Sequence, residues 1–339
     1  MRRDLPPSLP GHFGVFTSRI AREHGWTPEA LKHAVRRERI VRVAPGFYVD
    51  ACQWHGTSAE DAKRRLLMRT VAATTTVKAA VASHTSSALL AGLSVWELPD
   101  RPCITRPPRS TGDAVCAHLH RATLPSDHVL DTVEIPRTRA ARTVLDIARE
   151  HGIEDAVVVG DEALRRAMTD PQRLLAAAEY CATWPGIRRA VDVLELLDPR
   201  SESAIESVSR LRIGRTTLPD PEPQVEIFDR NGVFLGRLDF YWDEFGVGGE
   251  VDGKVKYRDD PRAVWWREKK RQEPMEDCGL SFVRWGRADL EDMAQLESRI
   301  AGMLARGARR PVTDRDWIAR PTEPRFPLMR DVRLLALSR

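Results

Sequence analysis

The first fifty residues alternate short apolar stretches with residues that start and stop helices. Over Phe16–His24, hydroxyl residues that can cap a helix precede the apolar positions, and Gly25 ends the segment. Thr27 then suits an N-cap and Pro28 the first position of a second helix that continues to Arg39. The pattern predicts two helices joined by a tight turn.

A small hairpin is expected directly after these helices. Ile40–Val43 and Phe47–Val49 are rich in β-forming residues, and Ala44–Gly46 between them has turn chemistry. Two close helices followed by a β wing predict a winged helix-turn-helix domain over residues 11–50.

Charge supports a DNA-binding role for this domain. Residues 1–50 hold nine Lys and Arg against five Asp and Glu, and this excess of four equals the net charge of the whole chain. In a winged helix the second helix enters the major groove of double-stranded DNA. The side chains expected to meet DNA are Lys32, His33, Arg36, Arg37, Arg39 and Arg42. The alternative is a basic helix that is merely solvated, and the added hairpin weakens it.

Two runs in this domain, Gly14–Trp26 and Arg39–Tyr48, resemble the N-terminal winged helix of AbiEi-type antitoxins of type IV toxin–antitoxin systems. Those antitoxins are transcriptional autoregulators, so the resemblance implies DNA binding. It also brings in a cognate toxin as a partner to consider. Operator-binding winged helices are often dimers, and a homodimer is expected by that analogy.

Residues 58–198 read as a mixed α/β middle domain. The helical and strand-like segments are Ala59–Ala73, Lys78–Leu93, Ala140–His151 and Glu154–Ala167, with strands near Val115–Leu119 and Val129–Ile135. His84 with Ser86 and Ser87, and His118 with His120, have no third ligand or catalytic partner at a sensible spacing. We therefore expect them to be ordinary hydrogen-bonded or surface residues.

Residues 199–306 have a different pattern, with a helix, a meander and further alternating elements. The expected elements are a helix over Ser201–Ile213, strands over Gln224–Phe228, Val233–Trp242 and Val247–Lys254, a helix over Pro261–Asp277, a strand over Leu280–Trp285 and a helix over Leu290–Leu304. The predicted order is α-β-β-β-α-β-α.

Acidic residues occupy two of these strands, where they are normally disfavoured. Asp239 lies in one strand, and Glu250 and Asp252 lie in the next. Because strand side chains alternate, Glu250, Asp252 and Lys254 would share one face if the strand continues that far. Carboxylates beside a lysine suit metal-assisted phosphodiester cleavage, so Asp239, Glu250 and Asp252 are candidate ligands for Mg²⁺.

These motifs resemble the PD-(D/E)xK nuclease superfamily, in particular its very-short-patch-repair-like branch. About 100 residues carry the resemblance: the helix acid Glu206, Asp239, the segment Glu250–Gly253 and a basic helix at Arg267–Gln272. The resemblance implies a restriction-endonuclease-like fold and catalytic roles for these acids. It also implies phosphate contacts from the basic helix, through Lys269, Lys270 and Arg271. Asp252 stands where the superfamily has its lysine, so Lys254 or Lys256 must supply that charge.

Length and composition fit several soluble domains. A chain of 339 residues favours two or three domains. The apolar stretches are too short to span a bilayer and no signal peptide follows the first residues, so we expect no membrane and a cytoplasmic protein. The five scattered cysteines predict buried thiols, and residues 307–339 predict a basic, partly ordered tail.

Three functions stay open from the sequence. The leading one is a DNA-binding protein with a Mg²⁺-dependent endonuclease-like domain. The second is a non-catalytic regulator or antitoxin with a degenerate nuclease fold. The third is an RNA-directed nuclease, against which the winged helix argues because A-form RNA excludes such a helix from its major groove.

Overall fold

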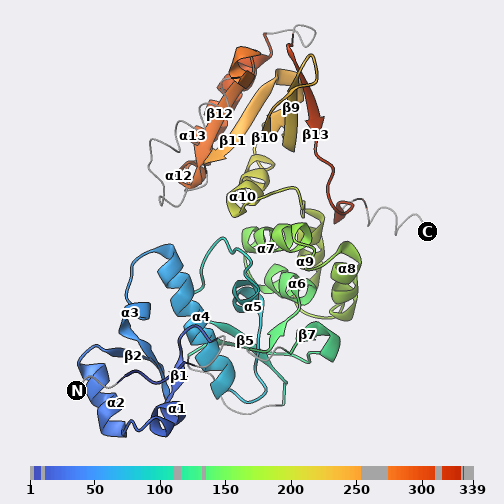
Figure 1. Ribbon diagram of the computed structural model, residues 1–339. Coiled ribbons are helices and arrows are strands. Elements are labelled where there is room, and N and C mark those ends of the chain that lie inside the picture. Colours follow the sequence, from blue (N-terminus) through green and yellow to red (C-terminus); the bar gives the residue numbers. More distant parts are fainter. Residues whose placement is uncertain are drawn as a thin grey trace. The chain divides into compact units, whose positions relative to one another are not determined.

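The computed structural model describes residues 4–8, 12–109, 116–131, 135–252, 274–309, 315–329 and 331 (Figure 1). The chain divides into two compact units. The first comprises Met1–Asp155 with Gln172–Ala190, and the second comprises Ala156–Pro171 with Val191–Arg339. The helices in the described parts are all too short or too polar to span a bilayer.

The first unit begins with the winged helix. Its elements are β1 (Phe16–Thr17), α1 (Ser18–Glu23), α2 (Pro28–Arg36), β2 (Ile40–Ala44) and β3 (Phe47–Asp50). The predicted caps are confirmed: the Thr17 hydroxyl accepts from the Ile20 amide at 3.2 Å, and the Thr27 hydroxyl accepts from the Ala30 amide at 3.1 Å. The three strands form one sheet in the order β1-β3-β2.

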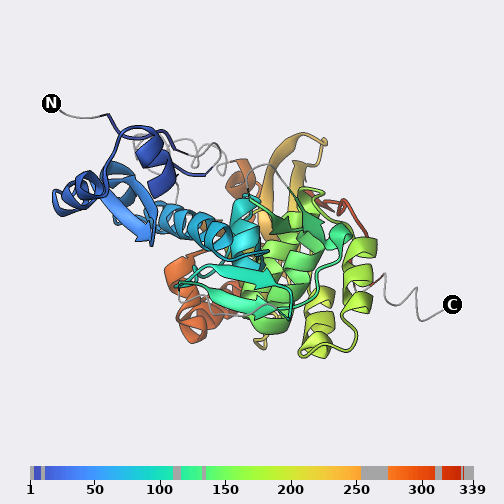
Figure 2. The ribbon, with the colours of Figure 1, turned by 90° about the horizontal axis from the view of Figure 1, so that it is seen from below.

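The wing shares a hydrophobic core with the long helix that follows it. Helix α4 (Ala59–Thr76) comes after the short α3 (Ala51–Trp54) and buries Met68 and Val71 against Val49 of β3. The helix also contacts β5, so it runs from the winged helix to the next sheet (Figure 2). The winged helix is therefore packed on the rest of its unit through a common core.

A second sheet of the first unit has the strand order β6-β5-β4-β8-β7. Its strands are β4 (Val81–Ala82), β5 (Cys103–Arg106), β6 (His118–Arg121), β7 (Val129–Leu130) and β8 (Arg137–Thr138). The helices along this stretch of the chain are α5 (His84–Leu90), α6 (Ala140–Glu150), α7 (Ile153–Arg165), α8 (Pro171–Tyr180), α9 (Ile187–Glu195) and the 3₁₀ turn η1 (Ser126–His128). Most of α7 and the end of α9 belong to the second unit.

One predicted helix of this region is wrong in its first half. Instead of a single helix over Lys78–Leu93, the chain forms β4, which pairs with β5, and only then α5. Ala79 has a left-handed φ of +57°, which no helix continues through, and Val81 pairs with Thr105. Tertiary pairing outweighs a helical pattern of small residues here.

The second unit contains a sheet in the order β12-β11-β10-β9-β13. Its elements are α10 (Ala204–Ile213), β9 (Glu222–Asp229), β10 (Phe234–Trp242), η2 (Asp243–Phe245), β11 (Val247–Asp252), β12 (Ser281–Gly286), α12 (Arg287–Leu290), α13 (Met293–Gly307) and β13 (Trp317–Pro321). Strands β11 and β12 are parallel, and the other pairs are antiparallel.

This arrangement confirms the expected helix, the three-strand meander and the later strand. The predicted final helix is present but begins later than expected, at Met293, because Asp292 caps it by accepting from the Gln295 amide at 3.1 Å. Leu290 is instead the last residue of the short α12. The tail contributes β13, an edge strand that the sequence pattern does not predict. The predicted helix over Pro261–Asp277 lies outside the described residues except for 274–277, which are helical.

Packing between α10 and the sheet fixes the position of this helix. Trp285 of β12 stacks on Phe240 of β10 at 5.5 Å and donates a hydrogen bond to the Ser209 hydroxyl of α10 at 2.8 Å. A Cβ atom on Gly249 would come within 2.7 Å of the Trp285 ring, so this position requires glycine. The interlocked aromatic residues hold α10 over the centre of the sheet.

The five cysteines are free, as expected from their spacing. Cys103 and Cys181 are buried, which agrees with the prediction of buried thiols. Cys52 and Cys116 are exposed, so for them the prediction is wrong.

Candidate functional site

The exposed side of α2 is basic. The helix buries Leu31 and Ala34 and leaves Lys32 and Arg36 exposed, one turn apart on the same side. His33 on the helix, Arg37 at its end and Arg42 on β2 are also exposed, whereas Arg39 is half-buried. Lys32, His33, Arg36 and Arg37 therefore form one accessible strip along α2, because they are one and four residues apart.

A phosphate contact from this strip has a measurable signature. Removing one such contact should reduce the slope of log K against log salt by about 1. We expect Arg36→Ala to weaken binding of duplex DNA and to reduce the slope by that amount, measured by fluorescence anisotropy at several salt concentrations. Arg188→Ala is the matched control, because it removes an exposed charge of the same unit from outside the winged helix. Equal slopes for the Arg36→Ala variant and the wild type would contradict the assignment.

In the second unit, four polar residues stand at the same level of neighbouring strands. Leu238 pairs with Val225 and Phe240 with Pro223, so Asp239 between them lies level with Gln224. Phe240 also pairs with Gly249, which puts Asp239 beside Glu250. Glu250 in turn pairs with Arg284 of β12. The row crosses β9, β10, β11 and β12 in that order.

Helix α10 adds Glu206 to this row. One oxygen of Glu206 accepts from the Ser203 hydroxyl at 2.6 Å, and the other accepts from the Gln224 amide at 2.9 Å. The same Gln224 Nε2 lies 3.5 Å from Oδ1 of Asp239, whose other oxygen accepts from the Val251 amide at 2.8 Å. Gln224 is buried, has a left-handed φ of +53° and bridges the two carboxylates. We call Glu206, Gln224, Asp239 and Glu250 the acidic row.

The far end of the acidic row is cationic. Nε of Arg284 lies 3.5 Å from Oε2 of Glu250, which is itself buried. Asp252, two residues further along β11, is exposed. An arginine therefore stands beside Glu250, whereas Lys254 and Lys256, the lysines expected to supply this charge, lie outside the described residues.

The electrostatics of the row affect Glu206 most strongly. Burial, together with the negative charge of Asp239, raises the pKa of Glu206 to about 7. Glu206 is thus a carboxyl that changes charge near neutral pH. Such crowding of carboxylates is what a divalent cation relieves when it binds.

This raised pKa predicts how stability changes with pH in metal-free buffer. The pKa of Glu206 is about 7 in the folded state and 4.5 in the unfolded state. The stabilising contribution of its protonated form is therefore fully present below pH 4.5 and is lost as pH rises through 7. The loss is on the order of 3 kcal/mol. We expect Glu206→Gln to remove most of it, so that its melting temperature relative to wild type rises between pH 5 and pH 8 in EDTA. A difference that does not change with pH would contradict this result.

The structure brings together only part of the predicted catalytic set. Glu206, Asp239 and Glu250 converge, and Asp252 lies at the exposed end of the strand. The remaining candidates, Lys254, Lys256, Lys269, Lys270 and Arg271, lie outside the described residues. Gln224 and Arg284 were not predicted. A glutamine at the start of a strand and an arginine on an exposed strand position give no signal of their own.

The oxygens of the acidic row do not form a ready-made triad. Among the described residues, the group of three ligand atoms within 4.8 Å of one another consists of histidines of the first unit. Mg²⁺, however, commonly uses one or two carboxylates and keeps several waters. Asp239 and Glu250, on adjacent strands at one level, provide hard oxygen donors of that kind.

Comparison with known proteins bears on the N-terminal module. Residues 3–49 match the family described as "Transcriptional regulator, AbiEi antitoxin". These residues are therefore a regulator domain of the AbiEi antitoxin type, and this family points to DNA binding in a toxin–antitoxin context. The winged helix of the structure agrees with that assignment.

Matches that cover more of the chain have low sequence identity. The chain is 28% identical over 169 residues to two Mycobacterium tuberculosis proteins, "Uncharacterized protein MT2308" of strain CDC 1551 / Oshkosh and "Uncharacterized protein Rv2248" of strain ATCC 25618 / H37Rv. Each match covers 50% of this chain and 60% of the relative's length. The solved RV2827C protein of Mycobacterium tuberculosis is 19% identical, with a TM-score of 0.36 over 62% of this chain and 79% of that one.

Proposed function

We propose that this protein binds double-stranded DNA through its winged helix and cleaves it with a Mg²⁺-dependent endonuclease domain in its second unit. The observation that carries the proposal is the convergence of three acids: Asp239 and Glu250 lie at one level of neighbouring strands, and Glu206 reaches them from α10 through Gln224. The element order of helix, three antiparallel strands and a further parallel strand agrees with the resemblance to the PD-(D/E)xK superfamily.

Asp239 and Glu250 are the residues that would hold the metal. Val251 orients one oxygen of Asp239 through its amide and leaves Oδ1 directed toward the Gln224 side of the row. Mg²⁺, when bound, supplies charge neutralisation at the phosphate and activation of water. Glu206 then adds a carboxyl that changes charge near neutral pH and that can accept or release a proton beside the reacting centre.

Two sets of residues can supply the positive charge required at the phosphate, one within the described residues and one outside them. Arg284 stands beside Glu250 and is exposed, so its guanidinium can reach a phosphate oxygen at the edge of the row. Lys254 and Lys256 follow directly after β11 in the sequence and belong to the proposal as the replacements for the superfamily lysine. Either source would replace the superfamily lysine, whose position Asp252 occupies in this sequence.

In this proposal the protein acts in the cytoplasm, in a toxin–antitoxin or in a defence or repair context. A cognate toxin and a homodimer are the partners it includes besides DNA. The regulator domain at residues 3–49 supports the toxin–antitoxin context.

A second candidate is a non-catalytic regulator or antitoxin whose nuclease fold is degenerate. Asp252 at the lysine position favours it, and so does the Gln224 amide, which already bridges Glu206 and Asp239 without a metal. In that case the acidic row would be a structural hydrogen-bond network.

A plasmid-cleavage assay with Mg²⁺ or Mn²⁺, run beside a gel-shift assay, separates the two candidates. Cleavage that depends on the metal and stops in EDTA supports the endonuclease. A protein that shifts duplex DNA but leaves plasmids intact with either metal refutes it and supports the regulator.

A further inference from the structure

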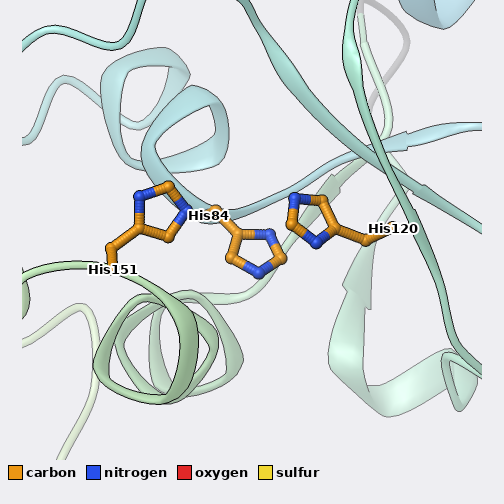
Figure 3. Close-up of side chains that lie close together, drawn as sticks. All are labelled: His84, His120 and His151. Atoms are coloured by element: carbon orange, nitrogen blue, oxygen red, sulfur yellow. The ribbon is translucent and has the colours of Figure 1, made fainter.

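Three histidines from distant parts of the sequence meet in the first unit. His84 begins α5, His120 lies in β6, and His151 directly follows α6. The rings of His84 and His120 stack with their centroids 3.8 Å apart, and the rings of His84 and His151 lie 5.3 Å apart. Figure 3 shows His84 between the other two. One ring nitrogen of each lies within 4.8 Å of the others.

In His84 and in His120, one ring nitrogen lies within hydrogen-bonding distance of a neighbouring oxygen. Nδ1 of His84 lies 2.9 Å from the Ser83 hydroxyl oxygen, and Nδ1 of His120 lies 2.8 Å from Oε2 of Glu150. When Nδ1 donates to these oxygens, the lone pair of each ring is on Nε2. Outer oxygens that hold a histidine in this way are a regular feature of metal centres.

The two remaining nitrogens lack hydrogen bonds. Nε2 of His84 and Nε2 of His120 are both buried, and neither has a hydrogen-bond partner in the part of the chain that the structure describes. Oε2 of Glu150 lies 3.5 Å from Nε2 of His84, but that oxygen is already engaged by His120. A buried polar atom is normally satisfied, so two buried nitrogens without hydrogen bonds are open to a ligand.

The backbone at His84 is also unusual. Its φ of +51° lies in the left-handed region, which a β-substituted residue rarely adopts. Strained residues of this kind cluster at binding and catalytic sites, where the surrounding structure holds them in place. Here the strain places the imidazole between His120 and His151.

We propose that His84, His120 and His151 form a site for one divalent transition-metal ion of the zinc class, with a coordination position left open. Three imidazoles suit zinc, cobalt or nickel rather than Mg²⁺. Three protein ligands with one open position are typical of sites that bind or activate a small ligand, whereas structural zinc sites have four. This proposal departs from the expectation, drawn from the sequence, that His84 and His120 are ordinary hydrogen-bonded or surface residues. Ser86 and Ser87 remain hydrogen-bonded structural residues, as predicted.

The surroundings indicate what the open position would face. His84 and His120 line a cavity of about 610 Å³, whose wall also includes Arg121, Arg142 and Arg149. Asp146 and Glu150 provide the opposite charge, so the cavity lining has an excess of cations. A small anionic group, such as a phosphate or a carboxylate, is the ligand class that fits beside the metal.

Metal binding to the full-length protein tests this site. The protein is first stripped with EDTA and dialysed, then titrated with Co²⁺, which is followed by its visible absorption, and with Zn²⁺ by calorimetry. We expect one equivalent of Zn²⁺ to bind and to displace Co²⁺, and an excess of Mg²⁺ not to compete. His120→Gln should weaken Zn²⁺ binding at least about 100-fold, and Glu150→Gln should weaken it about 10-fold or more.

His118→Gln is the matched control. His118 lies on the same strand two residues before His120, but it is exposed and pairs with Asp100 at 2.9 Å. It should bind Zn²⁺ as the wild type does, and so should Asp239→Asn, which changes only the acidic row. His151→Asn, at the half-buried end of α6, provides a second test if His120→Gln does not fold by circular dichroism. The proposal is overturned by a wild type that binds no equivalent of Zn²⁺, by His118→Gln weakening binding as much as His120→Gln, or by full binding in the folded ligand variants.

Discussion

Asp239→Asn is expected to reduce Mg²⁺-dependent cleavage of duplex DNA at least about 10³-fold, because a catalytic metal supplies several kcal/mol and each 1.36 kcal/mol is a factor of ten. Asparagine keeps an oxygen that can accept from the Val251 amide, so the pairing of β10 with β11 should persist. The variant instead removes the negative charge on the strand next to Glu250. The rate of conversion of supercoiled plasmid to nicked and linear forms measures the effect.

The matched control for Asp239→Asn is Glu244→Gln, which neutralises an exposed acid five residues further along the chain. It should cut at the wild-type rate. Both variants should shift duplex DNA in a gel as the wild type does, because the winged helix is unchanged. Cleavage by Asp239→Asn at the wild-type rate would contradict the assignment of Asp239 as a metal ligand. An equal loss in Glu244→Gln would point to a general effect of charge.

The winged helix could be predicted closely because its signals are local. Thr27 and Pro28 occupy the N-cap and first position of α2, and both functions depend only on neighbouring backbone. The turn at Gly46 likewise needs only its own φ of +80°. The two helices and the wing are therefore predictable from sequence to within a few residues of their ends.

The acidic row could be predicted only in part. Asp239 and Glu250 stand out in the sequence because acids in apolar strands are out of place. Gln224 and Arg284 depend on register, since each becomes part of the row only through its level on the neighbouring strand. Register follows from the pairing of whole strands, which a single sequence does not reveal at one position.

The histidine cluster could not be predicted for the same kind of reason. His84, His120 and His151 are more than 30 residues apart, so no ligand spacing is visible in the sequence. The strand β4 places His84 beside β5 and β6, and that strand was itself hidden in a segment that reads as a helix. His151, the histidine that the sequence pattern does not single out, lies close to the other two only through the tertiary fold.

Asp146→Ala is expected to destabilise the first unit by about 3 to 5 kcal/mol, the usual result of removing one partner of a buried ion pair. Oδ2 of Asp146 accepts from Nε of Arg142 at 2.7 Å, and Oδ1 lies 3.1 Å from Nη1 of Arg149. The side chains of Arg142 and Asp146 are each 1% exposed. Without Asp146, two buried guanidinium groups lose the carboxylate between them, and the stacking of both on Trp184 cannot replace it.

Thermal unfolding followed by circular dichroism checks this result. For a unit of this size the predicted loss lowers the melting temperature by roughly 10 °C. The matched control is Glu23→Ala, which breaks a pair with Arg19 at the same four-residue spacing, but at 3.8 Å and with both side chains more than half exposed. That change should cost less than about 1 kcal/mol, since exposed pairs contribute little. Equal melting temperatures for the two variants would show that burial of the Arg142–Asp146 pair does not stabilise this part of the unit.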